Sequence, residues 1–278
     1  MTTAIPQAPP RPGQSPPPSN SGVSETFTVK RGLSRKAHRI VLYGTGGIGK
    51  STLASLLTEV GLEPIFIDQE GGTQDMDVPR LAPAKSWTFS GIRAALASQN
   101  WNEKRVVVLD TMTKAQELAA DHIVSNVKTE KGAFVNSIED YGYGKGYKHL
   151  YDHMLLILSD LDRLCERGVN SLVICHDTRA TVPNPMGEDF LRYEPNLYHS
   201  STGKASVRDL LKGWADHLFF MAYDIAVNID GKAQGSGTRT IYTQESPMFL
   251  AKSRTVAGEY SYPVGDAGIW KTLFGKAV

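Results

Sequence analysis

The chain has little cysteine and no excess of charge of either sign. Cys165 and Cys175 are its only cysteines among 278 residues, too few for a disulfide framework or a four-cysteine zinc site. Lysine and arginine number 30 and aspartate and glutamate 29, so the formal net charge is +1. This balance excludes a protein held to nucleic acid by bulk charge alone, and any such contact requires a local patch.

Long apolar segments are also missing. No run of about 18 apolar residues is present to span a membrane, and the N-terminus lacks the apolar core of a signal peptide. Together with the scarcity of cysteine, these absences predict a protein of a reducing cytoplasm.

Proline is concentrated at the beginning of the chain, where residues 1–22 hold seven of the 15 prolines. Such a segment buries too little apolar surface to offset its ordering entropy, so we expect a disordered, Pro-rich tail. A docking role for the run at residues 16–18 is the alternative. One folded domain is expected over residues 35–278.

From about residue 38, apolar strands alternate with helical patterns, which predicts an α/β fold with a mostly parallel sheet flanked by helices. The expected strands are 39–43, 64–68, 105–109 and 171–175, and the expected helices are 51–60 and 145–167. Further along, antiparallel strands are predicted at 217–228, 238–244 and 249–254, with a hairpin turn at 231–237.

The most specific motif is a glycine-rich loop between the first strand and the first helix. It reads Gly44-Thr45-Gly46-Gly47-Ile48-Gly49-Lys50-Ser51 and matches G-x-x-x-x-G-K-[ST] in full. Backbone N–H groups and a helix N-terminus would hold phosphate oxygens. Lys50 would reach the β- and γ-phosphates, Ser51 would bind Mg²⁺, and Thr52 completes the expected contacts. The motif predicts ATP and Mg²⁺ as cofactors.

Three polar residues follow apolar strands, where ligands of α/β proteins bind. Asp110 ends the third strand and is a candidate Mg²⁺ ligand, although a helix N-cap is the simpler alternative. Glu70 follows the second strand and is a candidate general base for water. His176 follows the fourth strand, where it could sense the γ-phosphate. Ordinary loop roles remain the alternatives for Glu70 and His176.

The order of these motifs resembles the RecA-type ATPase core over roughly residues 35–256. The likeness is strongest to small phage-borne RecA-like ATPases, some of which act as single-strand annealing recombinases. It implies an ATPase in the host cytoplasm that binds single-stranded DNA and assembles as a ring or filament, with a single-strand-binding protein as a candidate partner. Glu70 matches the catalytic glutamate and Asp110 the Walker B aspartate, whereas His176 replaces the switch glutamine, which argues against strand exchange.

The resemblance also implies a DNA-contacting loop after His176, at about residues 177–204, for which the sequence shows no clear periodicity. Arg179 and Lys204 are its candidate backbone contacts, and its tyrosines could stack on bases. A second candidate segment, residues 128–148, interleaves lysines with aromatic residues. Plain surface loops are the alternative for both segments.

Lys252 and Arg254 are spaced two apart on the last expected strand, so they would project to the same side. Two adjacent cations need an anion near them, and phosphate could supply it. The spacing resembles the paired cations that RecA-like ATPases extend into a neighbouring subunit's site. A solvated strand face and a DNA-backbone contact are the alternatives.

Other functions compete with a DNA-stimulated ATPase. The main alternative is a nucleotide-gated interaction module with little turnover. A ParA-type ATPase would carry a lysine where this chain has Thr45, and a small-molecule kinase would need an arginine-rich lid that the sequence does not offer.

Overall fold

The computed structural model describes residues 37–200, 204–227 and 233–275, together with Val29 and Arg31. The chain divides into two units, residues 1–35 and 36–278, and the helices and strands of the described residues all lie in the second. The tail predicted over residues 1–22 lies outside the described residues.

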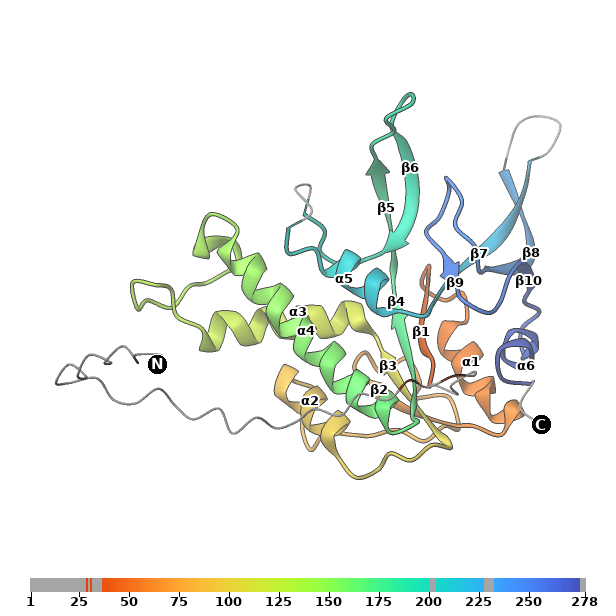
Figure 1. Ribbon diagram of the computed structural model, residues 1–278, viewed down its shortest axis with the longest axis horizontal. Helices are drawn as coiled ribbons and strands as arrows, with labels where there is room; N and C mark the ends of the chain where they lie inside the picture. Colours follow the sequence, from red (N-terminus) through yellow and green to blue (C-terminus); the bar gives the residue numbers. More distant parts are fainter. Residues whose placement is uncertain (1–28, 30, 32–36, 201–203, 228–232, 276–278) are drawn as a thin grey trace, which may run out of the picture. The chain divides into compact units, whose positions relative to one another are not determined.

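A sheet of eight strands forms the centre of this unit, with the order β10-β8-β7-β1-β4-β3-β2 and with β9 paired to β7 (Figure 1). Five neighbouring strands are parallel. They are β1 (Arg39–Gly44), β2 (Glu63–Asp68), β3 (Arg105–Asp110), β4 (Asn170–Cys175) and β7 (His217–Val227). The first four are nearly continuous apolar runs because helices cover both faces of the sheet.

Helices lie in two layers (Figure 1). One layer contains α2 (Phe89–Ala97), α3 (Met112–Asn126), α4 (Lys145–Glu166) and α5 (Val207–Trp214), with the short 3-10 helix η2 (Glu139–Tyr141) ahead of α4. The other layer contains α1 (Lys50–Ser55), its 3-10 continuation η1 (Leu56–Val60) and α6 (Gly268–Phe274). On α4, the residues that recur at spacings of three and four are buried in the core, as their pattern predicts: Leu150, Met154, Ile157, Leu158, Leu161 and Leu164.

The predicted α/β fold is confirmed: a mostly parallel sheet is flanked by helices and continues into antiparallel C-terminal strands. β8 (Ala233–Tyr242) runs antiparallel to β7, and β10 (Glu259–Ser261) antiparallel to β8. The strand expected at 249–254 is reduced to β9 (Lys252–Ser253), which pairs with the start of β7. β8 already begins within the expected turn at 231–237, and residues 228–232 lie outside the described part.

The expectation of an irregular loop after His176 is wrong for much of that segment. β5 (Asp177–Val182) and β6 (Phe190–Pro195) form a two-stranded antiparallel hairpin that projects from the sheet edge (Figure 1). Only β6 has clearly buried positions, Glu194 and Pro195, at its base. Because the hairpin buries little apolar surface, its strands carry no strong alternation of apolar and polar residues for sequence analysis to detect.

The strand order determines where the candidate residues meet. β1 lies between β4 and β7, and the carboxyl ends of the parallel strands share one edge of the sheet. In the described ranges, no helix is both long and apolar enough to cross a membrane.

Candidate nucleotide-binding site

The glycine-rich loop leaves the sheet at Gly44 and enters α1 at Lys50. A Cβ atom on Gly44 would lie 2.4 Å from the carbonyl oxygen of Met221 on β7, so only glycine fits there. Gly49, the N-cap of α1, has a φ of 98°, in the left-handed region that favours glycine. The backbone therefore turns tightly between strand and helix, as a phosphate-binding loop requires.

The Lys50 ammonium group lies inside this loop. Its Nζ donates to the carbonyl oxygens of Gly44 and Thr45, at 2.7 and 2.9 Å. Burial lowers the pKa of Lys50, and the Asp110 carboxylate opposes that shift. The lysine thus lies at the phosphate loop, bonded to two carbonyl oxygens of the loop and with a carboxylate in its electrostatic surroundings.

Ser51 and Asp110 contact each other across the edge of the sheet. The Ser51 hydroxyl donates to Oδ2 of Asp110 at 2.6 Å. Burial raises the pKa of Asp110 to about 6, with further contributions from the Asp68 and Glu70 carboxylates. A cation bound here would offset this concentration of negative charge.

These two oxygen donors suit Mg²⁺, which prefers hydroxyl, carboxylate, phosphate and water oxygens. Among the described residues, no three His, Cys, Asp or Glu side chains are grouped to hold a metal by themselves. Ser51 and Asp110 would therefore hold Mg²⁺ together with nucleotide phosphates and water, and the ion would neutralise charge on the phosphates.

Glu70 follows β2 and is held by residues that directly follow β3 and β4. Its Oε1 accepts from the Thr111 hydroxyl at 2.9 Å, and its Oε2 lies 3.0 Å from Nε2 of His176. Asp68 organises the backbone that carries Glu70, because its carboxylate accepts bonds from the N–H groups of residues 70–73. The structure thus brings together Glu70, Asp110 and His176 beside the phosphate loop.

Lys252 and Arg254 lie elsewhere. β9 pairs with His217 and Leu218 at the beginning of β7, whereas Gly44 and the phosphate loop lie near Met221 farther along that strand. Arg254 extends beyond β9 and forms an ion pair with Asp216 at 3.2 Å. The expected anion is thus supplied, for Arg254, by an aspartate of the same chain, and neither cation reaches this chain's own phosphate loop.

Two residues that sequence reasoning missed also lie at the loop. The Tyr223 hydroxyl donates to the Gly47 carbonyl oxygen at 3.3 Å, and Nη1 of Arg239 lies 3.1 Å from the position of a Cβ on Gly49. Tyr223 is on β7 and Arg239 on β8. Only the strand pairing brings them to the loop, and no motif marks either residue.

The proposed DNA-contacting residues are divided between elements. Arg179 is exposed on β5, whereas Lys204 lies ahead of α5 in a groove that also includes residues from the start of α4. The Tyr147 and Tyr198 rings stack there, with centroids 4.0 Å apart. The two candidate DNA-binding segments therefore meet at one surface.

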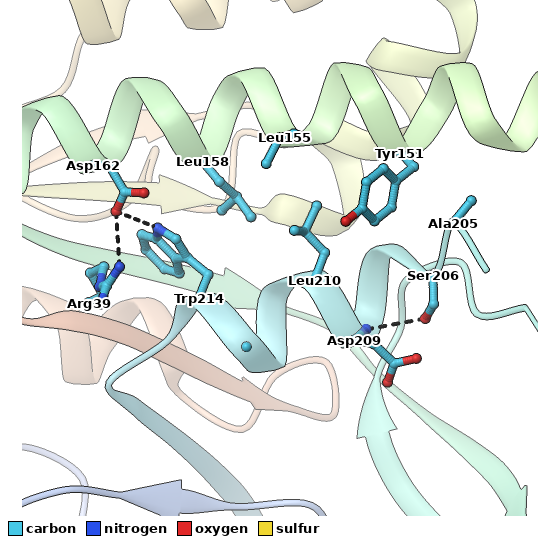
Figure 2. Close-up of a pocket in the computed structure, with 11 residues that line it drawn as sticks. Arg39, Tyr151, Leu155, Leu158, Asp162, Ala205, Ser206, Asp209, Leu210 and Trp214 are labelled. Atoms are coloured by element: carbon cyan, nitrogen blue, oxygen red, sulfur yellow. Dashed lines mark hydrogen bonds and ion pairs between the residues drawn. The ribbon is translucent and has the colours of Figure 1, made fainter. Parts of the chain in front are cut away.

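A further pocket lies between α4 and α5 (Figure 2). Two of its polar side chains are already paired: Asp162 accepts from Arg39 and from the Trp214 indole, and Ser206 accepts from the backbone of Asp209. Arg39 is at the start of β1, so this pocket borders the opposite end of that strand from the phosphate loop.

Comparison with known proteins identifies the family. No curated protein sequence matched the chain. Among solved structures, a KaiC-like protein from the archaeon Pyrococcus horikoshii shares 12% identity and a TM-score of 0.41, and the match covers 83% of this chain and 87% of that one. A likeness at that level carries no functional information. A family model described as an AAA domain matches residues 36–255, and the chain accordingly belongs to this AAA-domain family of P-loop ATPases.

Proposed function

We propose that the protein is a Mg²⁺-dependent ATPase that acts on single-stranded DNA during recombination or annealing, as an oligomer. The proposal of ATP hydrolysis rests on the position of the Glu70 carboxylate. It lies beside the phosphate loop, Asp110 and His176, where a base could take a proton from water.

The support for single-stranded DNA is the surface where the two candidate segments meet, which we call the lysine–tyrosine surface. It is lined by Tyr143, Lys145, Tyr147, Lys148, Tyr198 and Lys204, and an adjoining groove adds Lys128 and Lys131. Tyrosine rings can stack on bases of any sequence, and lysines can contact the phosphate backbone.

The acidic partners on this surface do not prevent DNA binding. Lys145 pairs with Glu130 and Lys148 with Asp152. All four side chains are about half exposed or more, and pairs of this kind contribute little free energy. Phosphate groups can therefore replace these carboxylates at low cost, and Tyr143 is fully exposed between the two grooves.

A direct route joins the nucleotide site to this surface. His176 contacts Glu70, and its carbonyl oxygen accepts from the backbone N–H of Asn196, just beyond β6. Tyr198 follows two residues later and stacks on Tyr147. A movement of His176 on binding or loss of the γ-phosphate would thus be transmitted to the lysine–tyrosine surface.

The test is ATP hydrolysis with and without single-stranded DNA, together with DNA affinity across a salt series. We expect DNA to stimulate hydrolysis. A Lys148→Ala/Lys204→Ala variant should bind DNA more weakly, with a salt slope reduced by about 0.7 per lost phosphate contact. Arg179→Ala tests the hairpin separately.

The matched control is Lys104→Ala/Lys271→Ala, which removes two exposed lysines from other parts of the surface. Equal DNA affinity for both double variants would contradict the surface assignment. Nucleotide binding without DNA binding or stimulation would instead favour the nucleotide-gated module with little turnover.

A further inference from the structure

Tyr223 and Arg239 form a cation–aromatic pair at the edge of the phosphate loop. They are direct partners in the β7–β8 register, two positions beyond the pairing of Met221 with Gly44. β1 has left the sheet at that level, so β7 and β8 continue past it and flank the loop. The Arg239 guanidinium carbon lies 5.3 Å from the centre of the Tyr223 ring.

Both side chains are directed to the loop. The Tyr223 hydroxyl donates to the Gly47 carbonyl oxygen, and Nη1 of Arg239 lies 3.1 Å from where a Cβ on Gly49 would stand. Nε of Arg239 is buried and has no hydrogen-bond partner in the described structure. A buried donor on a cation is costly unless it is paired, and a phosphate or ribose oxygen would satisfy it.

The strand order sets the direction of a bound nucleotide. Glu70, Asp110 and His176 lie at the carboxyl ends of β2, β3 and β4, all on one side of β1. Tyr223 and Arg239 are on β7 and β8, on its other side. Asp110, the candidate Mg²⁺ ligand, and Glu70, the candidate base, would both act at the γ-phosphate. The γ-phosphate is therefore expected on the side of β1 where β2, β3 and β4 lie. The nucleoside must then extend towards β7 and β8.

We propose that Tyr223 and Arg239 bind the nucleoside end of the nucleotide, from the α-phosphate to the base. Arg239 donates to the α-phosphate or ribose oxygens, and the half-exposed Tyr223 ring provides a flat apolar surface for the sugar and base. This inference rests on the proposed nucleotide binding and adds residues that bind the part shared by ATP and ADP.

The experiment measures binding of ATP, ADP and inorganic tripolyphosphate by calorimetry. Arg239→Gln should lower the affinities for ATP and for ADP by the same factor, about tenfold, because a charge-assisted hydrogen bond to their shared part is lost. Tyr223→Ala should lower the affinity for ADP. It should leave the affinity for tripolyphosphate unchanged, because that ligand has no nucleoside. Arg80→Gln is the matched control, since Arg80 is exposed and pairs with β2 at the far edge of the sheet.

Folding of each variant is checked by thermal unfolding, and Arg239→Lys and Tyr223→Phe replace any variant that does not fold. Tyr223→Phe should retain most of the ADP affinity, whereas Arg239→Lys should lose part of it because lysine lacks the planar fork of donors. If the wild-type protein binds ATP and the Arg239 and Tyr223 variants bind like it, the inference is overturned while the proposed function stands. A loss of affinity confined to ATP would place Arg239 at the γ-phosphate and would also overturn the inference. A wild-type protein that binds no nucleotide would overturn both.

Discussion

Nε2 of His176 lies 3.0 Å from Oε2 of Glu70, although the two residues are 106 positions apart in the sequence. The contact joins the candidate base to the residue that precedes the β5–β6 hairpin. It gives a physical connection between water activation and the segment proposed to contact DNA.

Glu70→Gln should lower the rate of ATP turnover by about 100-fold or more and leave the ATP affinity unchanged. The amide keeps the size of the side chain but cannot accept a proton from water. Steady-state hydrolysis and calorimetric ATP titration measure the two effects. Glu63→Gln, at the opposite end of β2, is the matched control. Parallel loss of binding and turnover in Glu70→Gln would contradict the role of base.

Lys50→Ala should weaken ATP binding by at least about tenfold, because the loop loses its buried ammonium group. Lys114→Ala removes a partly exposed lysine from the first turn of α3 and should not change the affinity. ATP titration compares the two variants. Wild-type affinity in a folded Lys50→Ala protein would refute the assignment of the phosphate loop.

Arg254→Ala should keep ATP binding and lose turnover if Lys252 and Arg254 act in a neighbouring subunit. Their position away from this chain's own phosphate loop is compatible with that role. Specific activity of the wild-type protein should rise with protein concentration. Mixing Arg254→Ala with Lys50→Ala subunits should restore part of the activity, since one intact composite site can form.

Absence of rescue in mixtures shown to co-assemble would leave Arg254 as a structural partner of Asp216. In that case Arg254→Ala should lower the free energy of unfolding without a specific effect on turnover.

His217 should make the protein less stable in acid. Burial lowers its pKa to about 4, with a further contribution from His38, which lies 2.9 Å away. The folded state therefore favours the neutral ring, so the full stability is present above pH 6.5 and falls as the pH is lowered from about 6.5 to about 4. The loss is up to about 3 kcal/mol.

Urea unfolding between pH 7 and pH 4 measures this effect. His217→Gln should flatten the decline, whereas His199→Gln, which changes an exposed histidine, should leave the slope as in the wild type. The same slope in the wild-type and His217→Gln proteins would show that other groups govern acid stability.

The local sequence determined the features that depend on neighbouring residues. Apolar runs identified the parallel strands, three- and four-residue spacings identified α4, and the glycine pattern identified the phosphate loop, because each pattern is confined to a short segment. The β5–β6 hairpin escaped detection because it buries too little apolar surface to leave a pattern.

Only the tertiary structure decided which distant residues meet. The strand order placed Glu70 next to His176 and brought Tyr223 and Arg239 to the phosphate loop, and it placed Arg254 beside Asp216 at the opposite end of β7. These relations depend on strand pairing and register, which are set by contacts between residues that are distant in the sequence. A linear pattern of residue types therefore does not encode them locally.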